Sequence, residues 1–130
     1  MVGSLSGEVG LPLRSAYCAS KHALSGYLDS IRLELKMRSI PLQITNCAPT
    51  SVNTEFHKQG RHGPPPSMGP EACAAACMAA YDSGGGTAFI PRYQRALTVL
   101  PTGLADGLIA RHERKLLDGV LEASTSRSRL

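Results

Sequence analysis

The 130-residue sequence lacks features that would assign it to several large protein classes. No apolar run approaches the ~20 residues that span a bilayer, and the N-terminus lacks the basic, apolar and small-residue pattern of a signal peptide. The net charge is only +4 and the basic residues form no long run, so nucleic acid is not expected as a partner. We therefore expect a soluble intracellular chain without a transmembrane segment.

The four cysteines form no CxxC pair, and an intracellular compartment favours free thiols over disulfides. Cys73 and Cys77 stand four residues apart in an alanine-rich segment, so they share one helix face. No histidine or further cysteine stands at ligand spacing, and no metal site is predicted. We interpret the cysteines as free, mostly buried thiols.

Glycine and proline divide the first half of the chain into a few elements. Residues 1–14 contain three glycines and a proline, which predict a strand end that runs into a loop. A helix capped by Ser15 should follow and end near Arg38, because Pro41 cannot continue it. Residues 41–49 are then predicted to contain a short strand.

The second half continues this alternation. Residues 50–70 are polar and rich in glycine and proline, which is typical of a long functional loop. A helix is predicted over 70–82, followed by three glycines that we interpret as a turn, since a phosphate-binding loop would open a helix. Residues 87–93 read as a second strand, and an interrupted helical pattern follows.

The predicted helix after Ser15 has one charged residue in its apolar face. Spacings of three and four select one stripe, consisting of Tyr17, Lys21, Leu24, Leu28, Ile31 and Leu35. An ammonium group within ~5 Å of a tyrosine favours its phenolate, which would let Tyr17 exchange a proton with a substrate oxygen. In the alternative interpretation, Lys21 extends from the edge of the stripe to solvent and Tyr17 covers a core.

Three residues carry a resemblance to a known family. Ser4, Tyr17 and Lys21, within "GSLSGEVGLPLRSAYCASKHAL", resemble the catalytic serine, tyrosine and lysine of the short-chain dehydrogenase/reductase (SDR) family, with the same spacing. The similarity continues through "IRLEL", "ITNCAP" and "VNTEF", and then more loosely to about Tyr93. Within the family, "SAYCASKHAL" is similar to the branch called dehydrogenase/reductase member 7.

The resemblance implies hydride transfer between NAD(P) and a small-molecule carbonyl or alcohol. Tyr17 would be the general acid/base, and Lys21 would both favour its phenolate and hydrogen-bond the nicotinamide ribose. Ser4 would hydrogen-bond the substrate oxygen where negative charge develops. The cofactor is expected to be NADP or NAD, with NADP slightly favoured.

The family also implies cofactor contacts after the strand. A Pro-Gly-x-Val-x-Thr segment usually lies there, and Pro49, Val52 and Thr54 stand at its proline, valine and threonine positions. Tyr17 and Lys21 would complete the cofactor contacts. Thr50 replaces the usual glycine, which would be costly if that position requires a positive φ.

The fold class implied is α/β, a partial Rossmann-like, doubly wound parallel sheet. The sequence has no glycine-rich nucleotide turn, so we expect the second half of an SDR fold with the N-terminal nucleotide-binding half absent. Residues 1–123 would form the C-terminal part of the catalytic domain, and residues 124–130 a polar tail.

This assignment has consequences for activity. The apolar stripe would lose its covering, so the chain alone is expected to be inactive, while the full-length protein would form a homo-oligomer. The alternative is a truncated, non-catalytic SDR that acts as a protein-interaction or dimerisation module.

The last three residues, Ser128, Arg129 and Leu130, resemble the tripeptide that the peroxisomal import receptor reads, of which Ser-Lys-Leu is the reference form. We therefore expect a peroxisomal location, with a cytoplasmic location as the alternative.

Overall fold

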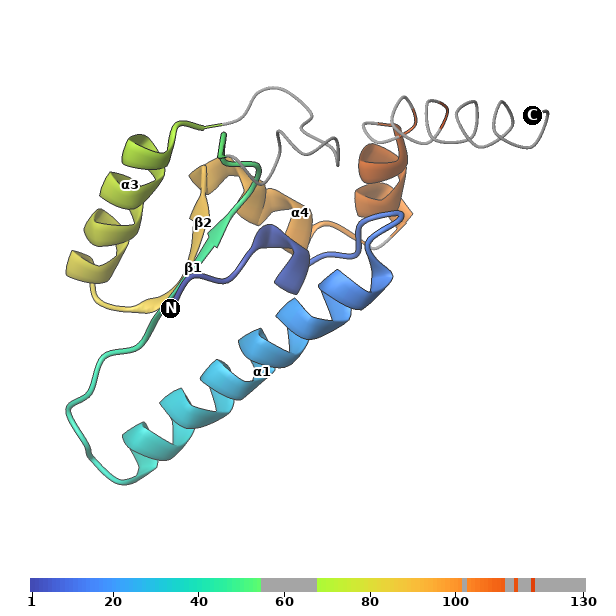
Figure 1. Ribbon diagram of the computed structural model, residues 1–130. Helices are drawn as coiled ribbons and strands as arrows, with labels where there is room; N and C mark the ends of the chain where they lie inside the picture. Colours follow the sequence, from blue (N-terminus) through green and yellow to red (C-terminus); the bar gives the residue numbers. More distant parts are fainter. Residues whose placement is uncertain (55–67, 102, 112–113, 115–117, 119–130) are drawn as a thin grey trace.

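The computed structural model describes residues 1–54, 68–101, 103–111, 114 and 118 (Figure 1). Its elements in chain order are the short 3-10 helix η1 (Leu5–Gly7), α1 (Ser15–Met37), β1 (Thr45–Pro49), α3 (Pro70–Asp82), β2 (Gly86–Ile90), the 3-10 helix η2 (Arg92–Gln94) and α4 (Arg95–Val99). Residues 103–111 are also helical. None of the helices in these described residues is long and apolar enough to cross a membrane.

The strand β1 is the centre of the sheet. It pairs in parallel with β2, in a register that runs from Thr45 opposite Gly86 to Pro49 opposite Ile90. On its other edge, Val2 forms a parallel bridge with Cys47. The first residues of the chain therefore extend the sheet beyond β1, and the predicted strand end before a loop is confirmed.

The helices α1 and α3 cover opposite faces of β1. Asn46 donates a side-chain hydrogen bond to Ser25 of α1, whereas the thiol of the next residue, Cys47, donates to a carbonyl of α3. Successive side chains of a strand point to opposite faces, so these two contacts place the helices on different sides. Figure 1 shows the same arrangement. All five residues of β1 are buried as a result.

The apolar stripe of α1 faces the interior. Leu28 is buried, and Leu24, Ile31 and Leu35 are half-buried. The expectation that this stripe would lack covering is therefore wrong for its central residue. Tyr17, at the start of the stripe, is exposed, and the other large apolar residues that α1 exposes lie on other sides of the helix and are Tyr27, Leu33 and Met37.

The ends of α1 agree only in part with those predicted from the sequence. Arg14 occupies the N-cap position without a side-chain cap, and Ser15 is the first helical residue, so the predicted serine cap is wrong. Leu13 has φ 61°, which turns the chain sharply before the helix. The predicted end near Arg38 is confirmed, because the helix finishes at Met37.

The second half follows the predicted order of elements. The helix over 70–82 is confirmed, and Gly84, Gly85 and Gly86 form a turn with positive φ values of 111°, 85° and 93°. Both strands are shorter than predicted, with five residues each. The predicted loop lies mostly outside the described residues, as does the polar tail over 124–130.

The predicted doubly wound parallel sheet is wrong for the described residues. They form a two-stranded parallel sheet to which the N-terminal residues add a single bridge. The sequence pattern identified individual strands, but it could not show how many partners each strand finds, because pairing depends on distant parts of the chain.

Candidate active site

Tyr17 and Lys21 lie on the first two turns of α1, four residues apart. The Lys21 ammonium nitrogen is 5.7 Å from the centroid of the Tyr17 ring, which is within the range of a cation–π contact. Lys21 is half-buried, and Tyr17 is 45% exposed. The structure therefore brings these two predicted residues together and leaves the tyrosine accessible to a solute.

Ser4 caps η1 at its N-terminus. Its hydroxyl oxygen accepts a hydrogen bond of 3.2 Å from the backbone N–H of Ser6. A hydroxyl that accepts one bond still has its own proton to donate. Ser4 can therefore cap the turn and donate to a second oxygen at the same time.

The segment after Ser4 packs closely on the turn of α1 that contains Lys21. A side chain at Gly7 would stand 2.8 Å from the Lys21 carbonyl oxygen and 2.9 Å from the Ser25 hydroxyl oxygen. Such distances are too short for a carbon atom, so only glycine permits this approach. The contact fixes η1 against the helix that contains the tyrosine and the lysine.

The parallel register places the predicted residues at one edge of the sheet. Val2 forms a parallel bridge with Cys47, and the backbone N–H of Gly3 donates to the Cys47 carbonyl oxygen at 2.7 Å, so the N-terminal segment runs alongside β1 up to Ser4. The helix α1 returns the chain from this edge to the start of β1, so its first turns also begin there (Figure 1). The carboxyl ends of parallel strands are where α/β proteins usually bind ligands.

The predicted cofactor segment continues from β1 at this edge. The backbone N–H of Thr50 donates to the carbonyl oxygen of Ile90 at 3.0 Å, and Val52 forms a parallel bridge with Met68. Val52 is half-buried and Thr54 is exposed. Thr50 does not have a positive φ, so threonine in place of the family's glycine causes no left-handed strain in this structure.

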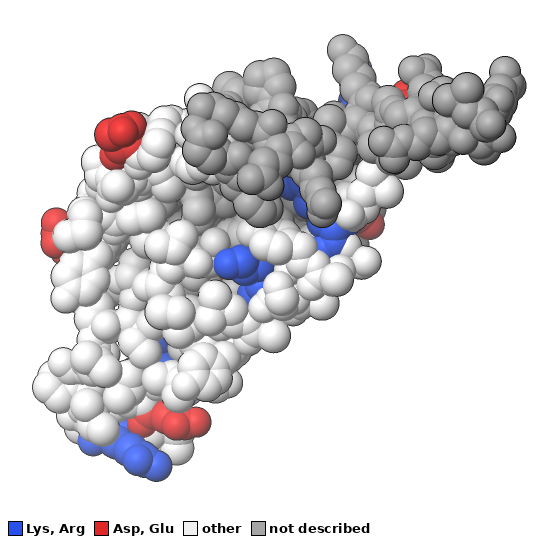
Figure 2. Space-filling view, viewed as in Figure 1, with Lys and Arg blue, Asp and Glu red and all other residues white. Residues whose placement is uncertain are grey.

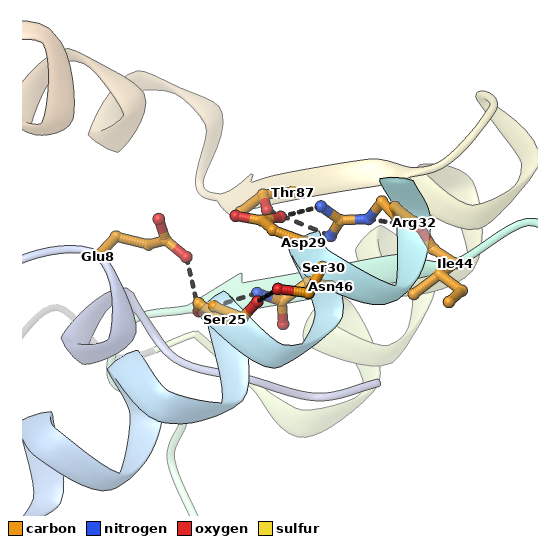
Figure 3. Close-up of polar contacts among 9 residues, drawn as sticks. Glu8, Ser25, Asp29, Ser30, Arg32, Ile44, Asn46 and Thr87 are labelled. Carbon is orange, nitrogen blue, oxygen red and sulfur yellow. Dashed lines mark hydrogen bonds and ion pairs between the residues drawn. The ribbon is translucent and has the colours of Figure 1, made fainter. Parts of the chain in front are cut away.

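A buried polar network that the sequence analysis missed ties three elements together (Figure 3). The Ser25 hydroxyl donates to Oε1 of Glu8 at 2.8 Å, and Asn46 donates to the Ser25 oxygen at 3.3 Å. Asn46, the second residue of β1, is fully buried. The only signal in the sequence was an amide within an otherwise apolar strand.

Arg32 forms a second link from α1 to the sheet, also drawn in Figure 3. Its side chain donates to the carbonyl oxygen of Ile44 at 3.3 Å and to the Thr87 hydroxyl at 3.5 Å, and it pairs with Asp29. On the face shown in Figure 2, charged side chains of both signs are scattered without a continuous basic area.

Two surface grooves lie away from the predicted catalytic residues. One groove, of about 420 Å³, lies at the C-terminal end of α1 and is lined by Arg32, Lys36 and the three-glycine turn. The other, of about 340 Å³, lies between the N-terminal residues and α3. Neither groove includes Ser4, Tyr17 or Lys21 in its lining.

The four cysteines are free, as predicted. Three of them are buried, and Cys77 is half-exposed. Burial and the neighbouring thiols of Cys47 and Cys73 raise the pKa of Cys77 to about 12. Within the described part of the chain, no group of three histidine, cysteine or acidic side chains could hold a metal ion.

Comparison with known proteins gives a family match over residues 1–64, to the model described as short chain dehydrogenase. Dehydrogenase/reductase SDR family member 7C of Xenopus tropicalis is 33% identical over 63 residues, or 48% of this chain and 19% of the relative. The uncharacterized oxidoreductase YxnA of Bacillus subtilis (strain 168) is 31% identical over 107 residues, or 76% of this chain and 30% of the relative. Dehydrogenase/reductase SDR family protein 7-like of Dictyostelium discoideum is 42% identical over 57 residues, or 44% of this chain and 17% of the relative.

These matches support the family and correct the fold assignment. The relatives include members of the branch numbered 7, at low identity and over part of the chain. The chain spans less than a third of the length of each of these relatives, at 19%, 30% and 17%. The family match lies at residues 1–64, in the N-terminal part of the chain. The prediction of a C-terminal half without the nucleotide-binding half is therefore wrong.

Replacing Ser25 tests the buried network. Ser25→Ala leaves Glu8 and Asn46 without their shared partner, so we expect the free energy of unfolding to fall by about 1–3 kcal/mol. The matched control is Ser30→Ala on the same helix, where an exposed hydroxyl donates to the Gly26 carbonyl oxygen. Its effect should stay within about 0.5 kcal/mol. Equal effects in urea denaturation would refute a structural role for the network.

Proposed function

We propose that this chain, whose residues 1–64 belong to the short-chain dehydrogenase family, contains the acid/base residues of an NAD(P)-dependent oxidoreductase that interconverts a carbonyl and an alcohol. The observation that supports this proposal is the contact between Tyr17 and Lys21 on the first turns of α1. Ser4 directly follows the segment that runs alongside β1, and Pro49 ends β1 at the carboxyl edge of the sheet.

The residues present are compatible with such a cofactor. The Pro49–Thr54 segment leaves the carboxyl edge without left-handed strain at Thr50, and Lys21 has ammonium protons available for a ribose hydroxyl. When bound, NAD(P) would supply or accept the hydride. Pro49, Val52 and Thr54 would hold it from the strand side, and Lys21 would hold it from the helix side.

Tyr17 would exchange the proton that accompanies the hydride. In the direction of alcohol oxidation the Tyr17 oxygen would accept the proton of the alcohol, with the Lys21 ammonium group beside its ring. In the opposite direction the phenol gives its proton to the developing alkoxide. Ser4 would donate its remaining hydroxyl proton to the same substrate oxygen, where a preorganised donor is most useful.

The acid/base role predicts a large effect of removing one oxygen atom. In the full-length protein, Tyr17→Phe should lower kcat by about 10²–10⁴-fold, because proton transfer to the substrate oxygen is lost. The measurement is NAD(P)H absorbance with a panel of ketones and alcohols. Tyr27→Phe is the matched control, since Tyr27 is an exposed tyrosine of the same helix, and it should leave kcat unchanged. A fully active Tyr17→Phe variant would disprove the assignment.

A second candidate is a non-catalytic interaction or dimerisation module. It is favoured by the apolar side chains that α1 exposes, with Tyr27 and Leu33 each 63% exposed and Met37 85% exposed. This candidate predicts that the purified chain forms a dimer or larger complex and never binds NAD(P)H. Sedimentation velocity and nicotinamide fluorescence measure the two properties on one sample. This second candidate would be excluded if the chain binds NAD(P)H and its turnover is lost when the Tyr17 hydroxyl is removed.

We also propose delivery to peroxisomes through Ser128, Arg129 and Leu130, which lie outside the described residues. A fluorescent protein fused in front of the chain should colocalise with a peroxisomal marker. Deletion of Leu130 should spread the fluorescence through the cytoplasm, because the receptor reads the terminal leucine. Unchanged localisation after this deletion would refute the signal.

A further inference from the structure

Three of the four cysteines meet where β1 faces α3. Cys47 is on β1, and Cys73 and Cys77 are one turn apart on α3. The Cys47 thiol donates to the backbone carbonyl oxygen of Cys77 at 3.8 Å. The Cys47 thiol of β1 therefore reaches the residue of α3 that carries the Cys77 thiol.

A small solute can reach this cluster. Cys47 and Cys77 both line the groove of about 340 Å³, together with Met1, Val2 and Tyr81. Cys77 is half-exposed, although Cys47 is buried. Cys73 is buried and does not line this groove. The accessible pair is therefore Cys47 and Cys77.

Covalent geometry also favours this pair. Residues four apart on a helix have Cβ atoms about 5–6 Å apart, whereas a disulfide needs about 3.5–4.5 Å. Cys73 and Cys77 could bond only if α3 unwound. Cys47 approaches Cys77 from a different element, where its thiol already contacts the Cys77 backbone, so this pair is not held apart by the spacing of one helix.

We propose that Cys47 and Cys77 form a reversible disulfide that links β1 to α3 when the protein meets a hydroperoxide. One thiolate attacks a peroxide oxygen, the O–O bond breaks, and a sulfenic acid forms with release of the first water or alcohol. The second thiol attacks that sulfur, the S–O bond breaks, and the hydroxyl leaves as water. The two sulfur atoms lose two electrons, and the two peroxide oxygens gain them. A dithiol reverses the bond by exchange.

The surroundings of Cys77 set the pH dependence of this reaction. Burial and the thiols of Cys47 and Cys73 raise the pKa of Cys77 to about 12, and Tyr81 and the Met1 ammonium are the other titratable groups at the groove. The Cys77 thiol is therefore protonated at neutral pH. Because only the thiolate attacks peroxide, oxidation should become faster with each step in pH from 7 to 9.

The link would act on the strand that leads to the proposed cofactor segment. Cys47 lies two residues before Pro49, where β1 ends. A bond between Cys47 and Cys77 would hold α3 against β1 at this position. The inference does not depend on the proposed oxidoreductase activity, since it rests only on the thiols and their packing.

The experiment treats the reduced, purified full chain with hydrogen peroxide and then alkylates the remaining thiols. The number of free thiols should fall from four to two, and dithiothreitol should restore all four. Elastase, which cleaves after small residues, separates Cys73 from Cys77 at the alanines between them. Mass spectrometry should then find the Cys47 peptide joined to the Cys77 peptide.

Variants provide the matched comparison. Cys73→Ser and Cys18→Ser should still form the link, whereas Cys47→Ser and Cys77→Ser should retain all their remaining thiols. Peptide mapping of the wild-type chain decides the case even where a variant fails to fold. A Cys47–Cys73 or Cys73–Cys77 peptide as the main product, or four free thiols after oxidation, would overturn the proposal.

Discussion

The complete burial of β1 is the constraint on which the rest of the structure depends. Its faces are covered by α1 and α3, and its edges bond to β2 and to the first residues of the chain. A strand buried in this way must satisfy every backbone group by pairing. The second residue of the strand, Asn46, also lies against Gly3, where any side chain would collide with the Asn46 carboxamide oxygen. The N-terminal residues, the two helices and β2 therefore hold one another in place through this strand.

The proposed active site derives its geometry from the same strand. The register of Val2 with Cys47 determines where Ser4 lies relative to Pro49, and the Glu8–Ser25–Asn46 network fixes α1 to β1. Tyr17 and Lys21 need no distant residue to meet, because one helix carries both. The remaining geometry comes from contacts between elements. The two grooves of about 420 and 340 Å³ lie elsewhere, so the proposed chemistry is argued from the side chains.

The sequence predicted those features that short stretches of chain determine. The helix over 70–82, the end of the long helix near Arg38 and the turn of three glycines all depend on nearby proline or glycine residues. The Tyr17–Lys21 contact follows from helical spacing alone. The predicted cap at Ser15 failed, although the residue type was suitable, because the chain reaches α1 through the left-handed Leu13.

Features that join distant residues could not be predicted from the sequence. The network between Ser25 and Asn46 and the gathering of three thiols both depend on how α1 and α3 pack on β1. The number of paired strands also could not be predicted from the sequence. The predicted doubly wound sheet therefore had more strands than the two that the described residues form. Thr50 illustrates the converse case, since an unusual residue suggested strain that the observed backbone does not contain.

The turn between α3 and β2 has a consequence for how the chain tolerates change. Three consecutive residues there have positive φ angles, which are unstrained only in glycine because it has no β-carbon. Substitutions in this turn should therefore destabilise the protein more than substitutions of the exposed alanines in the preceding helix α3. The same freedom makes the turn entropically expensive to order, so the pairing of β2 with β1 must supply the compensating free energy.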